Sequence, residues 1–354
     1  MRLSLESSDC YTVAWIAALP IERATTTALL DERHEQPKGF DQHQSDMNSY
    51  TWGRMGNHNI VIASLPAGSY GTTSAATTAS NLLSSLPHIK IGLLVGIGGG
   101  VSNPPHQDIR LGDVVVSQPD RTTGGVIQYD LGKAKPDERW ERKGSLNIPP
   151  SVLLHAVSNL QAEHFISASR IPDILQAMWD NNPQMKKTRS NLPGFIHQGC
   201  ENDRLFKSEY GHAGGDTCGA CSTSWEVKRD PREDTCPEIH YGVIASGNAL
   251  IKDATARDQL AEEIGGCLCV EMEAAGLMNH FPCLVIRGIC DYADSHKNDR
   301  WQQYASATAA AYAKELLHFV ESKKLQMTPT AVEMFRSVRE DLSEVTEKID
   351  SIGH

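Results

Sequence analysis

Two glutamates, Glu271 and Glu273, enter an apolar, alanine-rich segment with the sequence VEMEAAGLMNHF. Carboxylates are rarely buried without a partner, so this pair marks a candidate functional site. On a β-strand the two side chains would point to the same side, where they could accept hydrogen bonds from a vicinal diol such as that of a ribose. Alternatively, the two glutamates could stand at the start of a helix, where the helix dipole stabilises negative charge. Taken alone, the pair fits both interpretations.

A third carboxylate, that of Asp291, directly follows the apolar run CLVIRGIC. An aspartate at the end of a buried strand could donate a proton as a general acid. Arg287 lies four residues earlier in the chain. An ion pair between these two residues is one alternative, and a turn formed by the aspartate side chain is another.

Glycines follow apolar runs at two further places, VGIGGGV with Gly98 and AGSYG with Gly68 and Ser69. A glycine allows a backbone to approach a sugar or a base closely, and a tight turn accounts for VGIGGGV equally well. This run lacks the GxGxxG spacing and the following acidic residue of a dinucleotide fold, and it is not a GxxxxGK[ST] phosphate loop. The pattern therefore argues against a nicotinamide cofactor.

Cysteine usage indicates a reducing environment. Nine cysteines are present, and four of them lie in apolar runs: Cys267, Cys269, Cys283 and Cys290. Reduced, buried thiols of this kind are typical of a cytoplasmic or nuclear protein, and we expect a cytoplasmic location.

A polar segment rich in turn residues, about 197–240, is expected to be a surface insertion. It holds a CxxC motif together with further cysteines and histidines: Cys200, His212, Cys218, Cys221, Cys236 and His240. Such residues can hold a structural zinc ion, although their spacing matches no standard zinc module and free thiols explain them as well. Both interpretations remain open.

The overall composition is ordinary for a soluble globular protein, with 354 residues of which 40% are hydrophobic and 22% are charged. A net charge of −11 argues against a general nucleic-acid-binding protein, which would need a basic face. No stretch approaches the ~20 apolar residues of a membrane-spanning helix. We therefore expect neither nucleic acid nor a membrane as a partner.

Apolar runs of strand length alternate with helical segments. The predicted strands cover 11–19, 58–68, 91–101, 112–117, 242–247, 267–273 and 283–291, and the predicted helices cover 22–31, 72–86 and 306–320. This alternation predicts an α/β domain with a parallel or mixed sheet. Ligands bind at the carboxyl ends of the strands in such folds, and the candidate residues fall at those ends.

One large domain is expected over residues 1–325 and an amphipathic helix over 330–354. In this last segment, apolar residues from Ala331 to Ile352 recur at spacings of three and four, which is the pattern of a heptad seam. The helix could pack on its own domain, form an oligomer, or link the chain to a partner domain.

The order of the motifs carries more information than any one of them. IAALPIE, AGSYGTTSAA, GLLVGIGGGV, LGDVVVS, IASGNALI, VEMEAAG and VIRGICDYAD, within about 11–320, together resemble the nucleoside phosphorylase/nucleosidase superfamily. The branch they look most like is that of the methylthioadenosine/S-adenosylhomocysteine nucleosidases. The stretch EMEAAGLMNHFPCLVIRGICDYADSHKN is also similar to the purine-nucleosidase-like domains at the N-termini of fungal immune receptors.

This resemblance implies a three-layer fold with a central mixed sheet flanked by helices, and a homo-oligomer of at least two chains. The implied activity is hydrolysis of the N-glycosidic bond of an adenosine-type nucleoside or nucleotide, which releases adenine. Neither a metal ion nor an organic cofactor is implied for this reaction.

The resemblance also implies a role for each candidate residue. Asp291 would protonate N7 of the purine, Glu22 would orient or deprotonate the attacking water, and Glu273 would bind the ribose hydroxyls. The other substrate-binding positions that it implies are Gly68, Ser69, Gly98, Asn248, Ala249, Leu250, Ile251, Glu271, Met272 and Arg287.

The chain departs from the family pattern at three positions. Cys290 stands where a serine is usual, Asn248 where an aspartate is common, and Leu250 where a phenylalanine commonly stacks on the base. The hydrogen bond that the serine gives to the neighbouring aspartate is therefore in question, and stacking on the base must come from elsewhere.

The register near LPIERA separates hydrolysis from phosphorolysis. A shift of one residue replaces Glu22 by Arg23, which would then stand where a phosphorylase binds phosphate. We prefer Glu22 because it keeps IAAL in line with the nucleosidase strand. In the loop 120–133, Arg121 and Lys133 could meet a 5′-phosphate or could belong to a solvated loop. A phosphate-dependent phosphorylase and a non-catalytic nucleotide-sensing module are the alternatives to a hydrolase.

Overall fold

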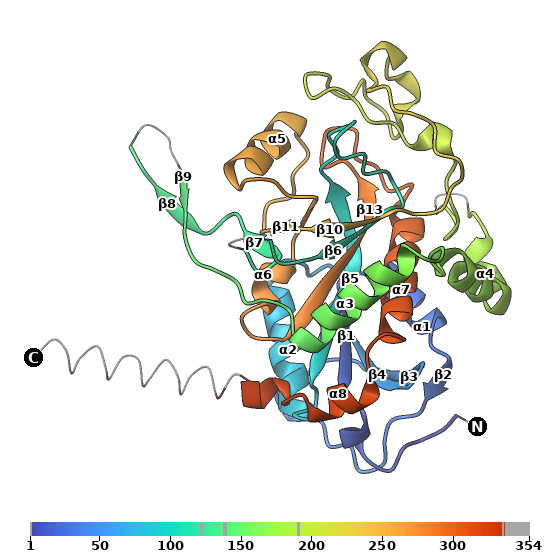
Figure 1. Cartoon of the computed structure of the whole chain (residues 1–354), viewed down its shortest axis with the longest axis vertical. Helices are drawn as coiled ribbons and strands as arrows, with labels where there is room; N and C mark the ends of the chain where they lie inside the picture. The colour runs from blue at the N-terminus through green and yellow to red at the C-terminus, as the bar shows by residue number, and fades with distance from the viewer. Residues whose placement is uncertain (1, 121–122, 137–139, 190–191, 335, 337–354) are drawn as a thin grey trace, which may run out of the picture.

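The computed structural model describes residues 2–336 except 121–122, 137–139, 190–191 and 335. Its centre is a mixed sheet with helices on both faces, and a long irregular segment projects beyond one end of the sheet (Figure 1). The predicted α/β class, with a central mixed sheet flanked by helices, is therefore confirmed.

The central sheet has eleven strands among the described residues. They are β1 (Val13–Ala17), β2 (Glu32–His34), β3 (Thr51–Met55), β4 (His58–Ser64), β5 (Ile91–Gly100), β6 (Val114–Ser117), β7 (Val126–Gln128), β10 (Ile239–Gly242), β11 (Ile244–Ser246), β12 (Cys269–Glu271) and β13 (Cys283–Asp291). A separate hairpin is formed by β8 (Gly132–Ala134) and β9 (Trp140–Arg142).

The helices of the described residues are α1 (Pro20–Ala28), α2 (Thr72–Ser85), α3 (Ser151–His164), α4 (Ile171–Asn181), α5 (Ala254–Glu263), α6 (Ala274–Leu277), α7 (Gln302–Leu317) and α8 (Ser322–Met327). The sequence predicted α1, α2 and α7. Short 3-10 helices add single turns, three of them in the insertion: η3 (Cys200–Asn202), η4 (Cys218–Ala220) and η5 (Thr223–Trp225).

The long strand β5 lies in the middle of the sheet. It runs parallel to β1 on one side and to β13 on the other, in the order β10-β6-β13-β5-β1-β4-β3-β2. The sheet is mixed because β6 is antiparallel to β13 and β3 is antiparallel to β4. Since β1, β5 and β13 are parallel, their carboxyl ends open at the same edge of the sheet.

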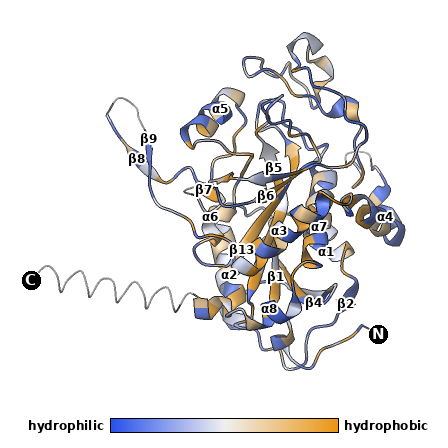
Figure 2. Cartoon of the chain, viewed as in Figure 1, coloured by the Kyte–Doolittle hydropathy of each residue, from blue (hydrophilic) through white to orange (hydrophobic). Residues whose placement is uncertain are grey.

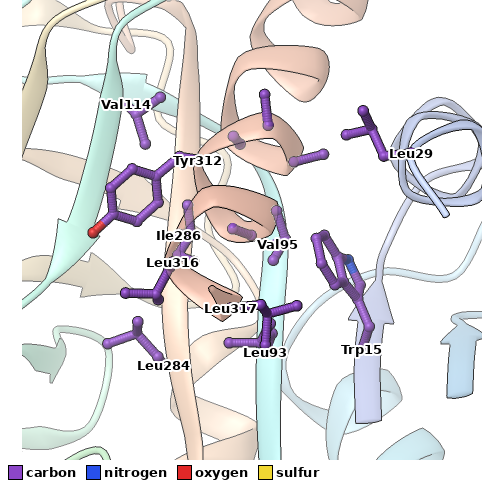
Figure 3. Close-up of a cluster of buried hydrophobic side chains, with 14 of the residues drawn as sticks. Trp15, Leu29, Leu93, Val95, Val114, Leu284, Ile286, Tyr312, Leu316 and Leu317 are labelled. Carbon is purple, nitrogen blue, oxygen red and sulfur yellow. The ribbon is translucent and has the colours of Figure 1, made fainter. Parts of the chain in front are cut away.

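Side chains alternate between two cores, as the period of two along a strand requires. In β1, Val13 and Trp15 enter the core that contains α3, α4 and α7, whereas Ala14 and Ile16 enter the core that contains α2 and α6. Figure 3 shows part of the first core, where Trp15 and Leu93 lie close to α7. In Figure 2 the central strands β1 and β13 are largely hydrophobic, whereas α4 and α5, at the periphery, carry hydrophilic residues.

The alanine-rich helix α7 packs closely on β13 and β5. Gly288 makes this approach possible, because a Cβ atom there would collide with the backbone carbonyl of Ala305 in α7. The helix therefore holds β13, the strand that ends in Asp291, firmly against the sheet.

The insertion lies between α4 and β10 and is built of turns. It contacts the segment that follows β13, where Arg229 donates to the hydroxyl of Tyr292 and the backbone N–H of His212 donates to the Ser295 hydroxyl.

Within the described residues, no helix has both the length and the apolar character needed to cross a bilayer. The helix predicted over 330–354 falls mainly on 335 and 337–354, which lie outside the described part of the chain, so it stays a prediction.

Gly288→Ala should lower the free energy of unfolding by about 1–3 kcal/mol, because the added methyl group forces α7 away from β13. Urea denaturation would measure the loss. Gly211→Ala is the matched control, since nothing lies within 4 Å of a Cβ atom at that exposed position. Equal stabilities of the two variants would contradict this account of the packing.

Candidate active site

A cavity of about 290 Å³ lies at the carboxyl ends of β5 and β13, beside the start of α1. Nine of the residues predicted from the sequence line it: Glu22, Gly98, Ala249, Leu250, Ile251, Glu271, Met272, Glu273 and Asp291. The fold thus gathers residues from five distant segments of the chain at one edge of the sheet.

Glu22 lies in the first turn of α1 and is buried. Its Oε2 accepts hydrogen bonds from the N–H groups of Ala18 (2.7 Å) and Leu19 (2.9 Å), and its Oε1 accepts from the N–H of Ile97 (2.9 Å). Burial is the main cause that raises the pKa of the Glu22 carboxyl, and the nearby Arg287 acts in the opposite direction. The three backbone donors fix the position of this carboxyl group at the cavity wall.

Arg287, in the middle of β13, is completely buried and holds the acidic residues together. Its Nη2 forms ion pairs with Glu271 and with Oε2 of Glu273, the latter at 3.2 Å. Burial would lower the pKa of Arg287, but the carboxylates of Glu271, Glu273 and Glu22 outweigh burial and raise it. The guanidinium therefore stays charged and supplies the partner that buried carboxylates need.

Glu271 and Glu273 use their oxygens differently. Glu271 ends β12, and besides Arg287 it accepts the N–H groups of Glu273 and Ala274 at 3.1 Å, where α6 begins. Glu273 accepts only two long hydrogen bonds of 3.2 Å, from the Gly71 N–H and from Arg287. The oxygens of Glu271 are thus used by backbone N–H groups where α6 begins. The oxygens of Glu273 can still accept further hydrogen bonds from a ligand in the cavity.

The glycines of β5 make room for these charged side chains. A Cβ atom at Gly96 would collide with Oε1 of Glu22 and Nη1 of Arg287, and one at Gly99 would lie 2.9 Å from Oδ1 of Asp291. The run VGIGGGV belongs to the extended strand β5, so it forms no tight turn.

Asp291 ends β13 and is buried between three partners. Its Oδ2 pairs with the Lys297 ammonium (2.5 Å) and lies 3.1 Å from Sγ of Cys290, and its Oδ1 accepts the N–H of Ala293 (2.8 Å). Burial above all, together with the charge of Asp291, raises the pKa of the Cys290 thiol, which therefore remains an S–H donor. Cys290 thus supplies the hydrogen bond that was in question, and Asp291 pairs with Lys297 instead of Arg287.

Four predicted site residues lie outside the cavity lining: Gly68, Ser69, Asn248 and the buried Arg287. Gly68 and Ser69 form an exposed turn, in which the Ser69 N–H donates to the Pro66 carbonyl. The Asn248 side chain is exposed and is used within the protein, since it accepts from Thr72 and donates to Asp130.

Three polar lining residues were not singled out from the sequence: Tyr70, Lys297 and Gln302. Tyr70 is the single aromatic side chain among the described lining residues, and it follows the predicted Gly68 and Ser69 directly in AGSYG. Lys297 lies in the polar loop after β13, where no periodic pattern marks it. Tyr70 is thus the available aromatic ring in place of the phenylalanine that Leu250 replaces.

Arg23 and Lys133, two of the cations considered for phosphate binding, do not line the cavity. The Arg23 guanidinium donates to the Ser49 carbonyl, to Thr51 and to Ser64, away from the site. Lys133 is exposed in β8, and Arg121 lies outside the described residues. In the part of the chain that the structure describes, Lys297 is the single cationic residue of the lining.

Residues 196–322 match the family model of the phosphorylase superfamily. The chain is therefore similar to this superfamily over that segment. A nucleotide-binding leucine-rich repeat (NLR)-like protein of Hyaloscypha variabilis is 42% identical over 320 residues, which are 89% of this chain and 30% of that protein. An ATP nucleosidase, Cap17, of Escherichia coli is 32% identical over 84 residues, which are 22% of this chain and 17% of the relative. The chain therefore spans less than a third of the first relative's length.

Two solved structures share the fold across most of the chain. Futalosine hydrolase of Helicobacter pylori has a TM-score of 0.54 at 16% identity, covering 88% of this chain and 99% of that one. A 5′-methylthioadenosine/S-adenosylhomocysteine nucleosidase of Neisseria meningitidis has a TM-score of 0.53 at 14% identity, covering 86% and 97%. The predicted nucleoside phosphorylase-like fold is confirmed by these likenesses.

The buried carboxyl of Glu273 predicts how stability depends on pH. Burial, helped by Glu271 and Glu22, raises its pKa above the ordinary value of 4.5, so the folded chain binds this proton more tightly than the unfolded chain. As pH rises above 4.5, wild type should lose roughly 1 kcal/mol or more of unfolding free energy relative to Glu273→Gln. Urea denaturation of both proteins between pH 5 and 8 would measure the difference, and a difference of opposite slope would contradict it.

Proposed function

We propose that the chain is a purine nucleosidase, which hydrolyses the N-glycosidic bond of adenosine or its 5′-phosphates to adenine and ribose or ribose phosphate. The observation that supports this most is that Arg287 and Lys297 are each paired with carboxylates, while Glu22 and Glu273 retain acceptor capacity. The name of the Escherichia coli relative, an ATP nucleosidase, supports an adenine nucleotide as substrate.

Cleavage of the bond between C1′ and the purine builds positive charge on the ribose ring. The carboxyl groups of Glu22, Glu271 and Glu273 surround a single guanidinium, so this region stabilises a cation when they ionise. Glu273 would accept the ribose hydroxyls because its hydrogen bonds within the protein are the longer ones. Glu22 would take the proton from the water that attacks C1′.

The leaving purine needs a proton on N7 as the bond electrons move into the base. Asp291, which lines the same cavity, would donate that proton. The aspartate left behind would be stabilised by the Lys297 ammonium and the Cys290 S–H, both of which contact Oδ2. These two residues thus favour proton transfer from Asp291 to the base.

Hydrolysis is favoured over phosphorolysis because a phosphate nucleophile would need an unpaired cation. Lys297 is paired with Asp291, and Arg287 is paired with two glutamates. Arg23, which the alternative register would place at a phosphate site, is hydrogen-bonded to Ser64 instead.

A homo-oligomer of at least two chains stays a prediction, which light scattering would test.

The most informative experiment is a chromatographic substrate panel of adenosine, inosine, guanosine, methylthioadenosine, AMP and ATP, each with and without phosphate. The proposal expects adenine release that does not depend on phosphate. Formation of a ribose 1-phosphate would identify a phosphorylase instead. Nucleotide binding without turnover of any substrate would identify a sensing module.

Asp291→Asn should lower the rate of adenine release by about 10²–10⁴-fold, because the amide cannot protonate N7. Glu22→Gln should cause a loss of the same order, since it removes the base that takes the proton from water. Asp41→Asn is the control, because this aspartate is exposed and lies outside the cavity lining. Full activity of Asp291→Asn would show that the acid is another group.

Tyr70→Ala should weaken substrate binding by roughly 1–3 kcal/mol, which appears as a raised KM, if the ring stacks on the base. Tyr70→Phe keeps the ring and should behave like wild type. A loss that is equal in both variants would assign the effect to the hydroxyl group and would rule out stacking.

A further inference from the structure

Three potential metal ligands lie together in the insertion, away from the candidate active site. The ligand atoms of His212, Cys218 and Cys221 lie within 4.8 Å of one another. Neighbouring ligands of a tetrahedral zinc ion lie about 3.8 Å apart when each Zn–S bond is about 2.3 Å long. Small rotations of these side chains would therefore suffice to surround an ion.

The CxxC turn is already shaped to present both sulfur atoms to one point. The Cys221 N–H donates to the Cys218 carbonyl at 3.0 Å in the 3-10 helix η4. The Arg204 side chain donates to the carbonyl groups of both cysteines and pairs with Glu226. Both cysteines are free thiols, and Cys221 is buried.

His212 contributes one ring nitrogen to this group. Its Nε2 lies 3.3 Å from the Thr217 carbonyl, an arrangement that places the proton on Nε2. Nδ1 then carries the lone pair, and a metal ion bound there would replace the hydrogen bond of 3.1 Å that Nδ1 accepts from the Gly214 N–H. A carbonyl partner on the outer nitrogen is the usual arrangement for a histidine that binds a metal.

The fourth position has a candidate in His296, whose ring centroid lies 5.4 Å from that of His212. Its side chain is 5% exposed, yet neither ring nitrogen has a hydrogen-bond partner. Buried polar atoms without partners are rare, because each costs free energy. Asp294 lies 3.4 Å from Nδ1, where it could orient the ring and leave Nε2 for a ligand.

A second group of potential ligands, Asp113, Glu238 and His240, does not make the same case. Both oxygens of Asp113 already accept from the Arg232 guanidinium, and His240 is hydrogen-bonded to Asp113. This group is an ion-pair network with its charges satisfied.

We propose that His212, Cys218, Cys221 and His296 bind one structural zinc ion that fastens the insertion to the loop after β13. Two sulfur and two nitrogen ligands in tetrahedral arrangement form a closed site of the kind that structural zinc occupies. His296 directly precedes Lys297, which pairs with Asp291. The ion would thereby hold the loop that positions the candidate acid and its partner.

Metal content tests this without any substrate, so its result is independent of the nucleosidase proposal. The whole chain is prepared in reductant, with a histidine-free tag that is then cleaved. Inductively coupled plasma mass spectrometry should then find about one zinc ion per chain. The double variant Cys218→Ser, Cys221→Ser should hold less than about a tenth of that amount. The double variant Cys200→Ser, Cys236→Ser is the matched control, since both of these cysteines are exposed in the same insertion, and it should retain the ion.

His296→Ala should bind zinc roughly 10–100-fold more weakly in a competition with a chromogenic chelator. Replacement of zinc by cobalt in wild type provides a readout that needs no variant to fold. It should give the thiolate charge-transfer and visible absorption bands of a tetrahedral cobalt site. A wild-type chain without bound zinc and without these bands would overturn the proposal, as would a Cys218–Cys221 disulfide in the reduced preparation.

Discussion

One buried guanidinium holds the candidate active site together. Arg287 stands in the centre of β13 and attracts carboxyl groups that the chain brings from α1 and from the segment after β11. Removing one partner of such a buried ion pair costs about 3–5 kcal/mol, because the remaining charge has no countercharge. The cluster has more carboxyl groups than cations, which suits a reaction that creates positive charge on a sugar.

The sheet topology is what allows these groups to meet. β5 has β1 on one side and β13 on the other, so the turn into α1 and the end of β13 face the same cavity. Gly96 and Gly99 have no side chains, and this leaves the space that Glu22, Arg287 and Asp291 occupy. On the far side of β13, Gly288 lets α7 press on the strand. Small residues thus position the charged ones.

Much of this arrangement could be predicted from the sequence, because buried strands have continuous apolar runs and functional side chains follow them. The central strands, the class of fold and the placement of Glu22, Glu273 and Asp291 at one cavity are of this kind. Lys297 and Tyr70 could not be predicted, since a polar loop has no periodicity that shows where its side chains point. The contacts of Asn248 with Thr72 and Asp130 could not be predicted for a related reason: being next to a strand end does not determine whether a side chain faces the cavity or a neighbouring loop.

The central claim is that the carboxyl groups around Arg287 stabilise a cationic sugar. Binding of an adenine-bearing iminoribitol, which carries a positive charge in the sugar ring, tests this most directly when calorimetry compares it with adenine and with an uncharged carbocyclic analogue. The account predicts that the cation binds at least about 10²-fold more tightly than the uncharged analogue, and that Glu273→Gln removes most of this preference. Equal affinities for the charged and uncharged analogues in wild type would contradict the account.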